Sequence, residues 1–199
     1  SGVKLLLAKA MTEGAGQKYL IQHSAGSGKS NSIAWLAHQL VSMTKDGQSV
    51  FDSIIVVTDR VNLDKQIKNT IKGFMQVANT VGHAEKSGDL KKLIQDGKKI
   101  IVTIVHKFQY ILDDIGSEHR KNKFAIIIDE AHSSQSSTMS AKMNMALSEN
   151  YDENDDETTE DKILKILEGR KMLTNASYFA FTATPKNKTL EMFGEKYIE

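Results

Sequence analysis

The stretch "YLIQHSAGSGKSNSIAWLA", residues 19–37, combines an apolar run, a turn with two glycines and a segment with helical apolar spacing. This order is typical of a loop that binds phosphate, because Gly26 and Gly28 let the backbone turn tightly and direct its N–H groups at an anion. The usual pattern is G-x-x-x-x-G-K-[ST]. Lys29 and Ser30 match the end of the pattern, but His23 stands where its first glycine belongs. The sequence predicts a phosphate site and leaves the role of His23 open.

Each residue of "GSGKS" has a chemical reason to be there. Lys29 can reach the β- and γ-phosphates of a nucleotide, and the Ser30 hydroxyl can ligate Mg²⁺. The helix that starts near Ser30 directs its positive end at the same anion. The alternative is a glycine-rich turn whose lysine is merely solvated, but the strand before and the helix after favour phosphate binding. The predicted nucleotide-binding residues are Gly26, Ser27, Gly28, Lys29 and Ser30.

Short apolar runs rich in β-branched residues recur along the chain. They are "KYLIQH" (18–23), "SIIVVT" (53–58), "KIIVTIV" (99–105), "FAIIID" (124–129) and "YFAFTA" (178–183). Because these runs do not alternate polar and apolar residues, both faces of each strand should be covered, as in a parallel sheet.

Helical patterns lie between these runs, at 31–44 and over Leu63 to Phe74. The alternation predicts an α/β fold with a mainly parallel central sheet and helices on both faces. We expect residues 1–199 to form one domain. The acidic stretch 149–161 should join a helix at about 136–148 to one at about 160–169.

Four of the expected strands end in polar clusters: "HSAGSGKS", "TDR", "DEAH" and "TATP". Parallel sheets place their ligands outside the carboxyl ends of the strands. In "DEAH", Asp129 can hold Mg²⁺ through water and Glu130 can activate the attacking water, as phosphoryl transfer requires. The alternative for an Asp-Glu pair after a strand is a helix N-cap with a favourable first-turn acid. The phosphate loop upstream favours the catalytic interpretation.

Composition and charge exclude several classes. The 199 residues contain no cysteine, so disulfides, thiolate zinc sites and cysteine nucleophiles are absent. No apolar run has transmembrane length and no signal peptide is evident, so we expect a cytoplasmic protein with no membrane partner. The net charge of +1 hides an uneven distribution, because the stretch 149–161 carries eight acids and no base. Without it, 17 acids face 26 bases and the remainder is +9.

"GSGKS", "DEAH" and "FTATP", in this order, match motifs I, II and III of superfamily 2 helicases and translocases. Together with "IIVVTDRVNLDKQI", "IIVTIVHKF" and "DEAHSSQS", the opening stretch resembles the motor region of the R (restriction and translocation) subunit of type I restriction enzymes. A histidine is common at the place of His23 in that family. The resemblance covers the chain from about residue 3 to its end and implies the first of two RecA-like motor domains, a three-layer P-loop fold.

The resemblance also implies a set of roles. ATP and Mg²⁺ would be the cofactors, with Lys29, Asp129 and Glu130 as catalytic residues and Ser30 and Asp129 as metal ligands. His132, Thr182 and Thr184 would couple the state of ATP to DNA. Backbone phosphates of DNA would meet hydroxyls and cations at two strand ends, which are groups that bind without reading sequence. These residues are Thr58, Arg60, Thr103 and Lys107, with His106 beside the last. The alternative for them is ordinary strand-end caps and surface charge.

The implied partners are double-stranded DNA, the specificity and modification subunits of a type I restriction complex, and a second RecA-like domain of the same parent chain. Nothing after Pro185 resembles that second domain, so we expect a fragment with little ATPase activity by itself. Two other functions stay open. One is a superfamily 2 helicase that acts on other nucleic acid, and the other is a P-loop switch or scaffold that does not hydrolyse its nucleotide.

Overall fold

The structure, a computed structural model, describes residues 2–23, 28–58, 81–84, 88–117, 119–129, 159–169, 173–182 and 187–193, with the single residues 69, 86 and 185. Its centre is a six-stranded sheet in which every neighbouring pair of strands is parallel. The strands are β1 (Lys18–Gln22), β4 (Ser53–Thr58), β5 (Val81–His83), β6 (Ile100–Ile104), β7 (Phe124–Asp129) and β8 (Ala176–Thr182). Their order across the sheet is β1-β8-β7-β4-β6-β5.

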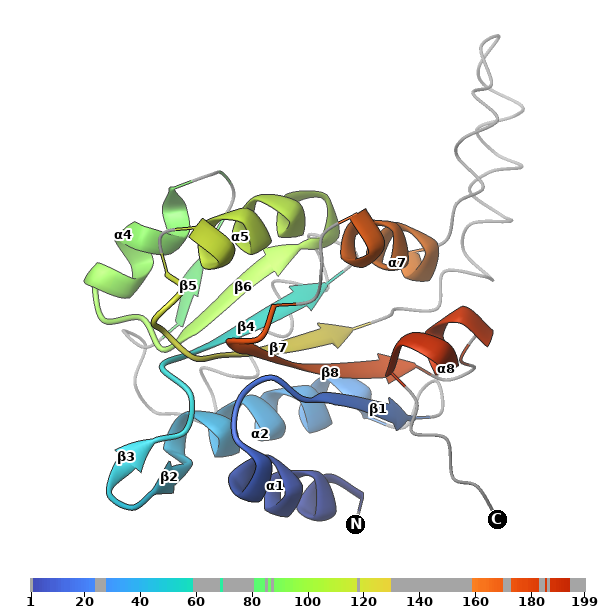
Figure 1. Ribbon diagram of the computed structural model, residues 1–199, viewed down its shortest axis with the longest axis horizontal. Coiled ribbons are helices and arrows are strands. Elements are labelled where there is room, and N and C mark those ends of the chain that lie inside the picture. Colours follow the sequence, from blue (N-terminus) through green and yellow to red (C-terminus); the bar gives the residue numbers. More distant parts are fainter. Residues whose placement is uncertain are drawn as a thin grey trace, which may run out of the picture.

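Helices cover both faces of this sheet (Figure 1). One face carries α1 (Gly2–Glu13) and α2 (Lys29–Ser42), and the other carries α4 (Asp89–Gln95), α5 (Val105–Ser117) and α7 (Thr159–Gly169). The short helix α8 (Asn187–Phe193) lies near the carboxyl ends of β8 and β1. The predicted three-layer α/β architecture with a parallel sheet is therefore confirmed.

Two apolar cores form between these layers, one on each face of the sheet. Ile127 and Phe181 belong to the core under α1 and α2, whereas Ile126 and Tyr178 belong to the core under α5 and α7. Successive residues of a strand point to opposite faces, so a strand covered on both sides needs an apolar residue at nearly every position. Strand β7, "FAIIID", meets this requirement and is buried along its whole length.

All five strands expected from the apolar runs are present. The bounds of 53–58 and 124–129 are as predicted, and those of the other three differ by one or two residues at an end. Among the helices, the one expected at 31–44 is α2 and the one expected at 160–169 is α7, which includes the last residues of the acidic stretch 149–161. The helix expected over Leu63 to Phe74, the one at about 136–148 and most of the acidic stretch lie outside the described residues.

Several elements were not expected. Strand β5 extends the sheet beyond β6, and helices α1, α4, α5 and α8 were not assigned from the sequence. A small antiparallel hairpin, β2 (Thr44–Lys45) with β3 (Gln48–Ser49), follows α2. Its two turn residues, Asp46 and Gly47, both have positive φ angles, 53° and 76°. Such a pair forms the tight turn whose twist matches that of the strands.

Of the helices that the structure describes, none combines the length and the apolar character needed to cross a membrane.

Candidate nucleotide-binding site

The candidate site lies at the edge of the sheet where the parallel strands end. Strand β1 leads into the glycine-rich loop, β7 ends at Asp129 and β8 ends at Thr182. These strands are brought together by the pairing of β8 with both neighbours, Gln22 with Thr182 on one side and Phe181 with Asp129 on the other. The polar clusters that follow β1, β7 and β8 therefore start from adjacent points, as the topology of a parallel sheet requires.

Helix α2 starts at Lys29, directly after the glycine-rich loop. Gly28 caps it with a φ of 79° and ψ of 31°, a left-handed conformation that a residue with a Cβ atom adopts only at a cost. The amide of Ser32 donates to the Gly28 carbonyl at 3.1 Å, which closes the first turn of the helix. Lys29 and Ser30 therefore lie in the first turn, where the helix dipole is positive and favours an anion.

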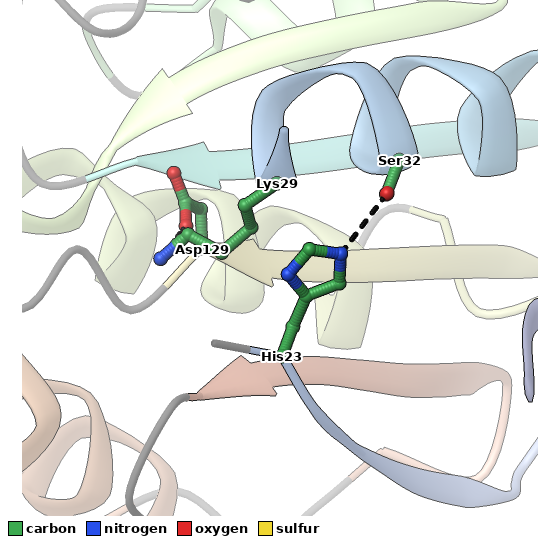
Figure 2. A network of polar contacts seen from close by, with 4 residues as sticks. All are labelled: His23, Lys29, Ser32 and Asp129. Atoms are coloured by element: carbon green, nitrogen blue, oxygen red, sulfur yellow. Dashed lines mark hydrogen bonds and ion pairs between the residues drawn. The ribbon is translucent and has the colours of Figure 1, made fainter. Parts of the chain in front are cut away.

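Lys29 and Asp129 form an ion pair at the centre of the site (Figure 2). The Nζ atom of Lys29 lies 2.8 Å from Oδ1 of Asp129, and the side chains are 17% and 0% exposed. Asp129 points to the α2 face of the sheet because it follows Ala125 and Ile127 at alternate positions of β7. A fully buried carboxylate is costly unless a cation or strong donors compensate it, and Lys29 supplies that charge.

His23 ties the end of β1 to two neighbouring elements. Its backbone N–H donates to the Thr182 carbonyl at 2.8 Å, and its ring Nε2 lies 3.2 Å from the hydroxyl of Ser32 in α2 (Figure 2). The ring also packs in tilted contact with Phe181, with 6.3 Å between centroids. His23 lies outside the left-handed region, since Asp46 alone among the described non-glycine residues has a positive φ. The backbone at position 23 therefore does not require a glycine.

The strand-end threonines are buried. Thr58, Thr103 and Thr182 are each 0% exposed. Thr58 follows Ile54 and Val56 at alternate positions, so it lies on the α2 face, as Asp129 does. The hydroxyl of Thr103 donates to the Ala84 carbonyl at 2.9 Å on the opposite face. Within the described part of the chain, the hydroxyls of Thr58 and Thr182 have no hydrogen-bond partner.

A histidine and a lysine occupy the first turn of α5, which follows β6 without an intervening loop. His106 is exposed and Lys107 is half-buried. This turn lies at the same edge of the sheet as Asp129, because β6 runs parallel to β4 and β4 runs parallel to β7. The carboxyl edge of the sheet therefore carries both the candidate nucleotide site and these two side chains.

The structure thus positions part of the predicted site. Gly28, Lys29 and Ser30 lie together at the start of α2, with Asp129 opposite Lys29. Ser32 was not predicted, because only the packing of α2 beside the end of β1 brings it to His23. Other predicted residues lie outside the described part of the chain, namely Gly26, Ser27, Arg60, Glu130, His132 and Thr184.

These groups suit a phosphate ligand that carries a divalent cation. A lysine ammonium and a helix N-terminus provide positive charge for phosphate oxygens. A buried carboxylate and a serine hydroxyl are the oxygen ligands that Mg²⁺ prefers, usually together with retained waters. Lys29 and Ser30 are adjacent in sequence and Asp129 lies against Lys29. The groups suited to phosphate and those suited to Mg²⁺ would therefore lie next to one another.

The strand order and the helices on both faces of the sheet define a RecA-like domain. A solved structure described as a hypothetical ATP-dependent RNA helicase, from Sulfolobus tokodaii, matches with a TM-score of 0.52 at 17% sequence identity. The match covers 98% of this chain and 49% of that one, and it shows the shared fold.

The family model of the SWI2/SNF2 ATPases matches residues 1–152, so the chain belongs to this family of helicase-like ATPases. It is also similar to a protein named as an endonuclease subunit of the type I restriction enzyme MjaIXP, from Methanocaldococcus jannaschii, with 27% identity over 186 residues. A second relative is the type I restriction enzyme SsaAORF53P endonuclease subunit of Staphylococcus saprophyticus, with 26% identity over 191 residues.

These two alignments cover 88% and 92% of this chain but only 14% and 16% of the relatives. The chain therefore spans a small part of the length of the curated relatives that it matches. The resemblance to type I restriction subunits inferred from the motifs is confirmed. The chain is a helicase-like ATPase motor domain related to those subunits.

Proposed function

We propose that this chain is the first of two RecA-like motor domains in the R subunit of a type I restriction enzyme. In a bacterial or archaeal cytoplasm, it would drive ATP-dependent translocation along double-stranded DNA, ahead of cleavage by a nuclease domain of the same subunit. The observation that carries the proposal is the Lys29–Asp129 ion pair, at 2.8 Å, at the carboxyl edge of the sheet in a chain of an ATPase family.

The ion pair suggests how the site receives its ligand. Lys29 neutralises Asp129 in this structure, so each of the two side chains already has a counter-charge before a ligand binds. The β- and γ-phosphates of ATP would draw the Lys29 ammonium away from the carboxylate. Asp129 and the Ser30 hydroxyl would then hold Mg²⁺, which neutralises charge on the phosphates when bound. The two exchanges would be coupled, because neither side chain would be left without a counter-charge.

Hydrolysis needs groups beyond this pair. Glu130 follows Asp129 directly, and we assign it the orientation and activation of the attacking water. A second RecA-like domain would supply an arginine, which contributes roughly 10³–10⁵ in rate in related phosphoryl-transfer enzymes. His132, Thr182 and Thr184 would transmit the state of the nucleotide to the DNA side. Thr182 supports this role because its strand lies between β1 and β7 and its carbonyl accepts from His23.

DNA would lie across the carboxyl edge and be held through its phosphates. Lys107, in the first turn of α5, and Arg60 are the cations that we assign to this contact, with His106 beside them. Thr58 and Thr103 are fully buried in this structure, so a contact of either with DNA requires its strand end to become uncovered. The specificity and modification subunits would recognise the target sequence, because phosphate contacts carry no sequence information.

The proposal is tested in the parent R subunit assembled with its specificity and modification partners. We expect ATP hydrolysis that depends on double-stranded DNA, and displacement of a third strand from a triplex without separation of the duplex strands. Glu130→Gln should lower the hydrolysis rate by at least about 10²-fold, since it removes the group that activates water. Glu191→Gln, at an exposed position of α8, is the matched control and should behave as the wild type.

Other results would contradict the proposal in specific ways. Separation of duplex strands, or stimulation by RNA, would indicate a helicase acting on other nucleic acid. Tight binding of ATP with no hydrolysis and no response to DNA in the assembled complex would indicate a nucleotide switch or scaffold. A normal rate in the Glu130→Gln protein would refute the assignment of the base.

A further inference from the structure

We propose that His23 is a positioning residue of the nucleotide site, which fixes the first turn of α2 against the end of β8 through its hydrogen bond with Ser32. This inference rests on the proposed function, because it assigns a role in the same nucleotide site. It also gives a reason for the histidine that replaces the first glycine of the usual phosphate-loop pattern.

The contacts of His23 join three elements at one residue. Its backbone N–H is held by the Thr182 carbonyl at 2.8 Å, so the residue continues the β1–β8 ladder by one position. Its ring reaches the other way, to the hydroxyl of Ser32 at 3.2 Å, and rests near the Phe181 ring. The side chain therefore forms a link between the sheet and the helix (Figure 2).

Ser32 is the residue through which this link can act on the ligand. Its backbone N–H closes the first helical turn onto Gly28 at 3.1 Å, and Lys29 and Ser30 lie within that turn. A hydrogen bond at Ser32 thus fixes the position of the turn that presents the Lys29 ammonium and the Ser30 hydroxyl. Without it, the turn would have more freedom, and ligand binding would have to restrict that freedom at a cost in affinity.

A glycine at position 23 could not make this link. The backbone there lies outside the left-handed region, so glycine has no conformational advantage at this position, whereas histidine adds a hydrogen bond. Glutamine is the conservative replacement, because its side-chain amide nitrogen can reach about as far as Nε2 of histidine and can bond to a hydroxyl.

The test follows MgATP binding through Trp35, the single tryptophan of the chain, which lies in α2 three residues after Ser32. Binding constants come from titrations of Trp35 emission with MgATP, and the melting temperature is measured on each ligand-free variant. The set is His23→Ala, His23→Gly, His23→Gln, Ser32→Ala and the double variant His23→Ala/Ser32→Ala. Ser42→Ala is the matched control, because its hydroxyl also belongs to α2 but bonds to His38 at the far end.

We expect His23→Ala, His23→Gly and Ser32→Ala each to weaken MgATP binding about three- to tenfold, as loss of one hydrogen bond predicts. The double variant should be no weaker than the single ones, because both remove the same bond. His23→Gln should bind within about twofold of the wild type, and Ser42→Ala should match it. A residue that only fills space would lower the melting temperature and leave the affinity of the folded protein unchanged.

Unchanged affinity in His23→Gly, which restores the usual loop pattern, would overturn the inference. Additive losses in the double variant, or failure of His23→Gln to restore binding, would overturn it as well. In each of these cases, binding that still depends on Lys29 would leave the proposed function standing. If the wild-type chain binds MgATP no better than Lys29→Ala does, the proposed function fails and the inference fails with it.

Discussion

Tyr178 is a residue whose ionisation the fold opposes. It lies in β8 with 1% of its surface exposed, and its phenol oxygen accepts a hydrogen bond from the Leu173 amide at 3.2 Å. Burial raises the pKa of Tyr178 above the ordinary value of 10.0, and the Leu173 hydrogen bond offsets this rise only in part. A raised pKa in the folded state means that the folded protein holds its proton to a higher pH than the unfolded chain does.

The stability contributed by Tyr178 is therefore fully present below about pH 10, where both states are protonated, and is lost as the pH rises from there through the folded-state pKa. We expect the free energy of unfolding to fall more steeply above pH 10 in the wild type than in Tyr178→Phe, by at most about 1.4 kcal/mol per pH unit. Urea unfolding across pH 8–11 measures this. Tyr110→Phe is the control, because the Tyr110 side chain is 40% exposed. Equal slopes in the wild type and Tyr178→Phe would refute the prediction.

Single residues differ in how far the sequence can predict them. Lys29 and Asp129 were predicted because their chemistry depends on short local patterns after strands, and they do meet as an ion pair. The contact of His23 with Ser32 had no such signal. It depends on the distance between the end of β1 and the first turn of α2, which packing of the whole helix on the sheet determines.

At the scale of secondary-structure elements, the junction of strand β6 and helix α5 carries one hydroxyl and one cation that have different roles. Thr103 is buried and bonds to the carbonyl of Ala84, just after β5, so it helps to hold the edge strand onto the sheet. Lys107 lies in the first turn of α5, half-exposed at the edge where DNA would bind. The two residues were predicted together as phosphate contacts, but Thr103 is buried and Lys107 is half-exposed.

We expect Thr103→Val to lower the free energy of unfolding by about 0.5–1.5 kcal/mol, through loss of the bond to Ala84, and to leave DNA affinity unchanged. Lys107→Ala should instead weaken binding to double-stranded DNA and reduce the slope of log K against log salt by about one. Lys121→Ala, exposed at the opposite edge of the sheet, is the control for a general charge effect. Weaker DNA binding in Thr103→Val at low salt would support a direct contact of Thr103 with DNA and contradict this account.

The elements show which patterns carry structural information. Strands that are covered on both faces, such as β7, have continuous apolar sequences, and each such run that was predicted to be a strand is one in the structure. Strand β5, "VGH", is too short for any periodicity, and its Gly82 sits where an added Cβ would lie 2.6 Å from a Leu93 methyl carbon. The hairpin after α2 did carry a signal, because Asp46-Gly47 is a preferred two-residue turn, but the flanking strands have only two residues each.

At the scale of the whole molecule, the order of strands creates the site. Strands β1 and β8 lie about 160 residues apart in sequence, yet they pair from Lys18 with Tyr178 to Gln22 with Thr182. Periodicity indicates that strands exist and that they are parallel, but it contains nothing about which strand lies beside which. The adjacency of the end of β1, the carboxylate of β7 and the end of β8 therefore became visible only in the fold.

A ligand bound at this edge would contact a helix and the sheet together, so its binding should stabilise the domain as a unit. A ligand that binds only the folded state stabilises it by about 2.7 kcal/mol at one hundred times its dissociation constant. MgATP held by α2 and β7 should therefore raise the melting temperature of the whole domain. ATP without Mg²⁺ should do so less, because the metal would be held by Asp129 and Ser30.

The most direct test of the central claim is the shift of melting temperature with MgATP, measured for the wild type, Lys29→Ala and Lys188→Ala. Lys188 is the matched control, because it also forms an ion pair with a carboxylate, that of Glu168 in α7, but this pair is about half exposed and does not include Asp129. We predict a Mg²⁺-dependent rise in the wild type and in Lys188→Ala, and none in Lys29→Ala. An equal rise in Lys29→Ala, or a rise that does not depend on Mg²⁺, would contradict the nucleotide site at Lys29 and Asp129.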